Sequence, residues 1–256
     1  MNLTINSFSI PKKDNTDDQN EDAFDITTFH FNDKEFFRIS LSDGATESYL
    51  SKKWAETLVR EFGCHNQIYS DNNFCDFIES AQKTFNVWKK KYPELREAEG
   101  RPLLFSEDFR LLEGSDATFL GINIQNDANS NGKYWSANSI GDTCLFQIRE
   151  EFIFSHPLQF SEEFNNSPNL LSSKDSRDFI KIKYIEKKWC YGDIIYLMTD
   201  AISCWFLQEY ENGNEPWITL DNITTQEEFN VFIMDLRQKK MIRNDDVTMI
   251  CVKFNK

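Results

Sequence analysis

The chain has 256 residues, of which 40% are hydrophobic and 23 are phenylalanine, and its formal net charge is −14. This length and apolar content predict a sizeable core in one domain spanning residues 1–256. The acidity argues against nucleic acid as a partner, because no basic excess offsets repulsion from phosphate.

The beginning of the chain lacks a basic stretch followed by an apolar one, so no signal peptide is expected. No apolar run approaches the roughly 20 residues needed to span a bilayer, so no membrane contact is expected. Six cysteines without paired spacing are typical of free, mostly buried thiols in a reducing compartment. We therefore expect a cytoplasmic protein.

The first half of the chain is predicted to form strands followed by helices. Strands are expected at residues 3–10, 23–31 and 36–42, the last two joined by a turn. Helices are expected at residues 50–63 and 73–90, each with an aromatic stripe that is typical of a face packed on a sheet. Prolines and a glycine predict a broken segment between residues 89 and 110.

A second series of strands is expected after Gly114, at residues 117–124, 133–140, 144–149, 152–155, 179–185 and 194–198. The polar segment 156–178 indicates a surface loop or flap. Helices are expected from Ala201 and behind a capping box at Thr225, before a last strand at residues 247–254. Helices grouped between blocks of antiparallel strands favour α+β layers over alternating β-α-β units.

Acidic residues stand where the expected strands begin or end. Five short stretches share this pattern: Asn20-Glu21-Asp22-Ala23, Ser42-Asp43-Gly44, Ile140-Gly141-Asp142-Thr143, Met198-Thr199-Asp200-Ala201 and Arg243-Asn244-Asp245-Asp246-Val247-Thr248. Each stretch alone is typical of a turn or a helix cap. If the strand ends converge, however, so many like charges require cations among them. Oxygen ligands without paired His or Cys favour Mg²⁺ or Mn²⁺, and two such ions can activate a water held between them.

In this order the motifs resemble those of the metal-dependent protein phosphatases of the 2C type, from about Asn20 to Phe254. The stretches Ser42–Ser48 and Trp205–Leu207 are similar to the compact bacterial branch in particular. The resemblance implies a four-layer α-β-β-α sandwich with two antiparallel sheets. It also implies hydrolysis of phosphoserine and phosphothreonine in a protein substrate, with a cognate kinase as a further partner.

The resemblance implies two Mn²⁺ or Mg²⁺ ions and assigns their ligands. Asp43 would bridge the two ions, and the carbonyl of Gly44 would bind one of them. Asp200 and Asp245 would complete the shell of the other ion.

Three further acidic positions match the family. Glu21 and Asp22 would act mainly through metal-bound waters, and Asp142 would share a third, weaker ion with Asp200. The segment Gly114–Thr118 would be structural. The expected catalytic residues are thus Asp43, Asp200, Glu21 and Asp22.

The chain departs from the family where many members carry an arginine that grips the substrate phosphate. That position, four residues before Glu21, is Asp17 here, and the nearest cations are Lys12 and Lys13. Because a lysine lacks the bidentate fork of a guanidinium, we expect weaker phosphate binding or a substitute cation from elsewhere. Ala45 stands where some animal members have a histidine.

Two other functions are weighed against this one. A catalytically weak or inactive relative could serve as a phosphoprotein-binding scaffold, but every metal-carboxylate position is filled, and an unneutralised charge cluster costs stability. A cysteine-based phosphatase fails on spacing. Cys144 and Arg149 have four residues between them, one fewer than that chemistry needs, and no glycine nest lowers the thiol pKa.

Overall fold

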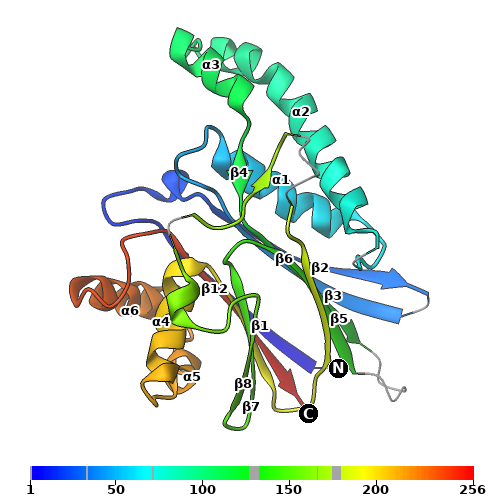
Figure 1. The fold of residues 1–256 in the computed structure, drawn as a ribbon, viewed down its shortest axis with the longest axis vertical. Coiled ribbons are helices and arrows are strands. Elements are labelled where there is room, and N and C mark those ends of the chain that lie inside the picture. The colour runs from blue at the N-terminus through cyan, green and yellow to red at the C-terminus, as the bar shows by residue number, and fades with distance from the viewer. Residues whose placement is uncertain (1, 33, 71, 127–132, 166, 175–179) are drawn as a thin grey trace.

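The computed structural model describes residues 2–32, 34–70, 72–126, 133–165, 167–174 and 180–256. Within them, two five-stranded antiparallel sheets pack face to face (Figure 1). The first has the strand order β1 (Asn2–Ile10), β12 (Val247–Asn255), β11 (Ile194–Met198), β7 (Cys144–Arg149) and β8 (Phe152–His156). The second has the order β10 (Lys183–Lys188), β6 (Tyr134–Ile140), β5 (Phe119–Asn126), β3 (Lys34–Asp43) and β2 (Asp22–Phe31).

Helices cover the outer face of each sheet (Figure 1). The second sheet carries α1 (Ser51–Cys64) and α2 (Phe74–Ala98), and α3 (Phe105–Glu113) follows α2 away from the sheets. The first sheet carries α4 (Asp200–Glu211), α5 (Pro216–Asp221) and α6 (Gln226–Gln238). Two short strands pair separately, β4 (Asp116–Ala117) with β9 (Leu171–Ser172). The predicted four-layer α+β sandwich is confirmed.

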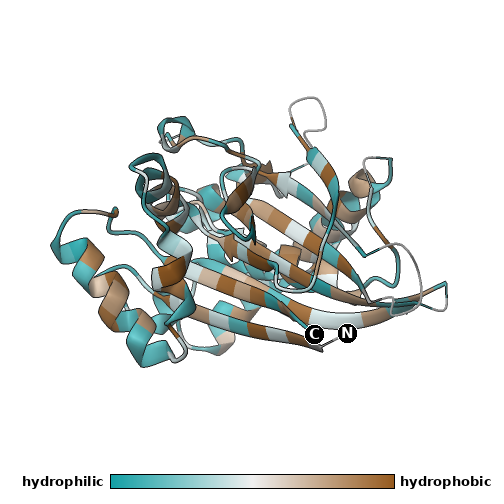
Figure 2. Cartoon of the chain, turned by 90° about the horizontal axis from the view of Figure 1, so that it is seen from below, coloured by the Kyte–Doolittle hydropathy of each residue, from teal (hydrophilic) through white to brown (hydrophobic). Residues whose placement is uncertain are grey.

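Apolar side chains fill the spaces between the layers. Strand residues alternate in direction, so Ile39 and Leu41 of β3 face the other sheet and are fully buried, while Ser40 points to α1 and donates to the carbonyl of Val59. The predicted aromatic stripes pack as expected, with Phe62 and Phe77 rings 5.5 Å apart. Figure 2 shows the apolar bands of the strands enclosed between helices of mixed hydropathy.

Several elements differ from the prediction. Helix α2 continues through Pro93 to Ala98 instead of breaking, because Pro93 faces solvent, where water can bond the carbonyl that the ring leaves without a donor. Helices α3 and α5 were not predicted. The strand expected at 179–185 is β10, displaced to Lys183–Lys188, and residues 127–132 and 175–179 lie outside the described residues.

All six cysteines are free, as expected. The prediction that most are buried is wrong, because Cys64, Cys75 and Cys190 are exposed at the ends of elements, which lie at the surface. No helix in the described part of the chain is long and apolar enough to cross a membrane.

Candidate active site

The strand ends that carry the acidic motifs lie at one end of the sandwich. In the second sheet Asp22 pairs with Asp43 across β2 and β3. In the first sheet Met198 at the end of β11 pairs with Cys144, and the turn before Cys144 brings the chain there from β6 of the second sheet. Asp142 lies in that turn. The antiparallel register therefore gathers residues that are far apart in sequence.

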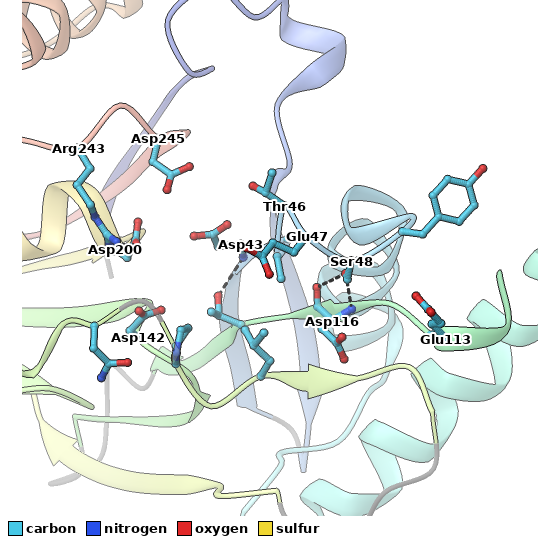
Figure 3. Close-up of a pocket in the computed structure, with 18 residues that line it drawn as sticks. Asp43, Thr46, Glu47, Ser48, Glu113, Asp116, Asp142, Asp200, Arg243 and Asp245 are labelled. Atoms are coloured by element: carbon cyan, nitrogen blue, oxygen red, sulfur yellow. Dashed lines mark hydrogen bonds and ion pairs between the residues drawn. The ribbon is translucent and has the colours of Figure 1, made fainter. Parts of the chain in front are cut away.

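A pocket of about 480 Å³ occupies this end of the molecule. Four carboxylates from different strand ends face its interior: Asp43, Asp142, Asp200 and Asp245 (Figure 3). The whole lining contains seven carboxylates, the other three being Glu47, Glu113 and Asp116. Arg243 is the sole basic side chain among the described residues that line it. Part of the predicted flap also borders the pocket, at Asn165, Pro168 and Leu170.

The pKa values of Asp43, Asp142 and Asp200 are all raised in this pocket. Burial raises the pKa of Asp43 well above its usual value, and the charges of Asp22 and Asp200 raise it further. Burial and the charge of Asp200 raise the pKa of Asp142 to about 7. Such shifts mark a place where a cation would relieve repulsion.

The donor chemistry of this cluster fits a hard divalent cation. Within the described residues, Asp22 Oδ1 and Asp200 Oδ1 are buried and accept no hydrogen bond. Carboxylate oxygens of this kind are the ligands that Mg²⁺ and Mn²⁺ take. Nevertheless, no three His, Cys, Asp or Glu side chains in the described ranges are already close enough to hold an ion. The pocket is therefore not a preformed cage, and the assignments of individual ligands stay predictions.

Glu21 and Asp22 lie beside the cluster and are held by hydroxyl groups. Glu21 accepts hydrogen bonds from Ser51 Oγ at 2.5 Å and Thr46 Oγ1 at 2.7 Å. Asp22, in the second sheet, accepts one from Thr248 Oγ1 of the first sheet at 2.7 Å. These bonds fix both carboxylates near the pocket, and neither residue is in its lining.

Thr118 holds the backbone of Asp43. Asp43 N donates to Thr118 Oγ1 at 3.1 Å, and Thr118 N donates to the carbonyl of Asp43 at 2.8 Å. The strand predicted from Ala117 is interrupted at Thr118, between β4 and β5, where these bonds form. Thr118 thus has the structural role that was expected for the segment 114–118.

Two glycines allow the chain segments to approach at this end. A Cβ at Gly44 would lie 2.9 Å from the carbonyl carbon of Ser51. Gly141 has φ of +100°, and a Cβ there would lie 2.7 Å from Thr118 Cγ2. Neither position accepts a side chain without a shift of the backbone that positions Asp43 or Asp142.

Asp246 has a role that the motif alone did not reveal. Its carboxylate accepts the backbone N–H of Lys12 at 2.7 Å and that of Glu21 at 2.8 Å. Asp246 thus ties both ends of the loop between β1 and β2 to the start of β12, whereas Asp245 lines the pocket. The two consecutive aspartates Asp245 and Asp246 before the last strand were the only indication in the sequence, but the sequence does not tell which of them faces the loop.

Two cations reach the acidic cluster. Arg243 Nη2 forms an ion pair with Asp200 Oδ2. Lys12 Nζ lies 3.2 Å from Asp245 and 3.4 Å from Glu21. Asp17, at the position of the expected arginine, begins a 3-10 helix (Asp17–Gln19) and is absent from the described pocket lining. Sequence proximity pointed to Lys12 but not to Arg243, which comes from the other end of the chain.

No protein-family model matches the chain, and no curated protein matches it. Solved structures match it over nearly its whole length. A bacterial serine phosphatase aligns with a TM-score of 0.63 at 14% identity, covering 99% of this chain and 98% of that one. Serine/threonine phosphatase Stp1 from Staphylococcus aureus aligns with 0.63 at 15% identity, covering 100% and 96%. The S. agalactiae serine/threonine phosphatase aligns with 0.59 at 14% identity, covering 99% and 100%. The chain has the fold of bacterial phosphatases of the 2C type, as its motifs predict.

Proposed function

We propose that this protein is a Mg²⁺- or Mn²⁺-dependent phosphatase that hydrolyses phosphoserine and phosphothreonine in proteins. The observation that carries the proposal is the convergence of four motif carboxylates on one pocket: Asp43, Asp142, Asp200 and Asp245. The fold, which is that of solved bacterial serine/threonine phosphatases, supports the same activity.

Charge supplies the physical reason for a metal requirement. The pocket lining carries seven carboxylates against one guanidinium, so a phosphate dianion entering it would be repelled. Divalent ions, each with two positive charges, would remove most of this repulsion. Asp43 would bridge two ions, the Gly44 carbonyl would bind one of them, and Asp200 and Asp245 would bind the other. Asp142 would take part in a third site with Asp200.

When bound, such ions supply an activated water and positive charge for the phosphoryl oxygens. The protein's own groups orient the site. Thr118 holds the Asp43 backbone, and Thr248 holds Asp22. Arg243 lines the pocket, and a guanidinium can pair with a phosphate through two N–H groups, which makes Arg243 our candidate for the substitute cation.

A second candidate function is a phosphoprotein-binding module without turnover. It is favoured by the lack of a preassembled group of three ligands among the described residues, and by the pairing of Arg243 with Asp200. In that case the arginine would neutralise the cluster in place of a metal.

The decisive experiment measures phosphate release from p-nitrophenyl phosphate with Mn²⁺, with Mg²⁺ and with EDTA, alongside calorimetric titration of each metal. We expect metal binding and metal-dependent release. Asp142→Ala should lower turnover while its circular dichroism spectrum stays that of the wild type. Absence of both metal binding and release would contradict the phosphatase and favour the binding module.

A further inference from the structure

A second pocket, of about 420 Å³, adjoins the first. Arg243 lines both pockets and forms the boundary between them. The walls of the second pocket come from the segment 161–164, from one side of α4, and from the loop 240–243 that leads to β12. The two pockets are therefore neighbours, with the Arg243 side chain between them.

The two pockets have opposite charge. Seven carboxylates line the first, whereas the described lining of the second contains Lys240 and Arg243 and no acidic side chain. Glu211, at the end of α4, has its carboxylate bound by the N–H and hydroxyl of Ser161, at 2.7 Å and 2.5 Å. The chain has a net charge of −14, so a pocket whose described lining has basic and not acidic side chains differs in the sign of its charge from most of the molecule.

Lys240 stands on a well-defined turn at the rim of this pocket. Its φ is +58°, and its N–H donates to the carbonyl of Arg237 at 3.1 Å. The adjacent Lys239 pairs with Asp235 at 2.6 Å, but no such ion pair involves Lys240 within the described residues. The Lys240 ammonium is therefore available to an incoming ligand, and Lys239 offers a matched control one residue away.

We propose that the second pocket binds acidic side chains in the segment flanking the phosphorylated residue of a protein substrate. This inference rests on the proposed function, since it places the phosphoryl group in the first pocket. Trp205 and Ile242 provide apolar wall for the stems of such side chains, while Lys240 provides charge at the rim.

The test uses fluorescent peptides in which a methylene replaces the ester oxygen of phosphoserine, so that hydrolysis does not interfere. Three peptides are compared. One has glutamates on the N-terminal side of the phosphoserine analogue, one has them on the C-terminal side, and one has alanines in their place. Binding is followed by fluorescence anisotropy in Mg²⁺. We expect one glutamate peptide to bind the wild type about fivefold more tightly than the alanine peptide, and this preference to shrink with salt.

Lys240→Glu should abolish the preference, and Lys239→Glu should retain it. Equal affinities of all peptides for the wild type, or no binding of any peptide, would overturn the proposal. An equal loss in both variants would also overturn it, because general charge would then be the cause.

Hydrolysis of p-nitrophenyl phosphate, which has no flanking peptide, separates this proposal from the proposed function. An active enzyme without the preference would refute the second pocket alone. An inactive protein with the preference, lost in Lys240→Glu, would refute the phosphatase and keep the pocket.

Discussion

Asp43 is the residue on which the acidic cluster centres. Burial is the largest cause of its raised pKa. The charges of four other aspartates raise the pKa further, from the largest effect to the smallest, namely Asp22, Asp200, Asp245 and Asp142. Without a cation, the ionised form of Asp43 is therefore a source of instability that the fold tolerates. The same charge is what would hold two metal ions together.

Asp43→Asn should accordingly have opposite effects on stability and activity. In EDTA at neutral pH, the variant should unfold at a higher urea concentration than the wild type, because a repelled charge is gone. Its metal-dependent turnover should fall by at least about a hundredfold, since both ions lose a ligand. Asp25→Asn, a change on β2 outside the pocket lining, is the control and should keep turnover. Full metal-dependent activity in Asp43→Asn would refute the bridging role.

Arg243, our candidate for the phosphate-binding cation, pairs with Asp200 of the acidic cluster. Arg243→Gln should raise the KM for p-nitrophenyl phosphate and weaken inhibition by inorganic phosphate, each about tenfold, because a charge-assisted bidentate contact is lost. It should also tighten Mn²⁺ binding, measured by calorimetry, because Asp200 loses its ion pair. Arg243→Lys should recover part of the phosphate affinity. Arg60→Gln, on the exposed side of α1, is the control, and equal effects there would contradict the assignment.

At the scale of elements, the loop between β1 and β2 depends on the start of β12. Asp246 is 2% exposed and accepts two backbone N–H groups of this loop, those of Lys12 and Glu21. The loop in turn presents Lys12 Nζ and Glu21 to the acidic cluster. One carboxylate thus aligns a segment whose Lys12 and Glu21 side chains reach the acidic cluster.

Asp246→Ala should therefore destabilise the fold, by about 1–3 kcal/mol for each N–H left unpaired. Metal affinity should fall as well, because Glu21 is no longer positioned. Asp245→Ala is the informative comparison, since its side chain lines the pocket and its loss should weaken metal binding with little loss of stability. Urea unfolding in EDTA and metal titration separate the two effects. Equal unfolding midpoints for the two variants would contradict the distinction.

For the whole molecule, the acidic cluster at one end of the sandwich makes the free energy of unfolding depend on both pH and metal concentration. The folded-state pKa values of Asp43, Asp200 and Asp142 are all raised, that of Asp142 to about 7. Between the unfolded value of about 4 and these raised values, the folded chain binds protons that the unfolded chain has released. The metal-free fold therefore loses stability as the pH rises through this window. Protons and metal ions compete for the same carboxylates.

We expect the melting temperature in EDTA to fall between about pH 5.5 and pH 8, and the gain from Mg²⁺ to be larger at the higher pH. Thermal melts at both pH values, with and without Mg²⁺, check this. Asp142→Asn should flatten part of the pH dependence. A gain from Mg²⁺ that is equal at both pH values would show that these carboxylates do not bind the ion.

Much of the architecture was predictable because its causes are local. An apolar run from Phe36 to Leu41 that stops at Asp43-Gly44 identified β3, and the capping box at Thr225 identified the start of α6. The predicted elements were wrong where exposure to solvent or a contact with a residue distant in sequence changed the local structure. Pro93 is tolerated inside α2 because it faces water, and the strand at Thr118 is interrupted because Asp43 takes its hydrogen bonds.

The sequence by itself determined most of the strands and helices, and the carboxylates that stand at the strand ends, since periodicity and turn residues act over short distances. The arrangement in two sheets with covering helices was implied by the family resemblance. Only the tertiary structure decided which partners those carboxylates meet. Asp246 holds the N–H of Glu21 although the two are 225 residues apart, and Arg243 pairs with Asp200 across 43 residues. Such contacts depend on how strands from both sheets are registered at one end, which no local pattern records.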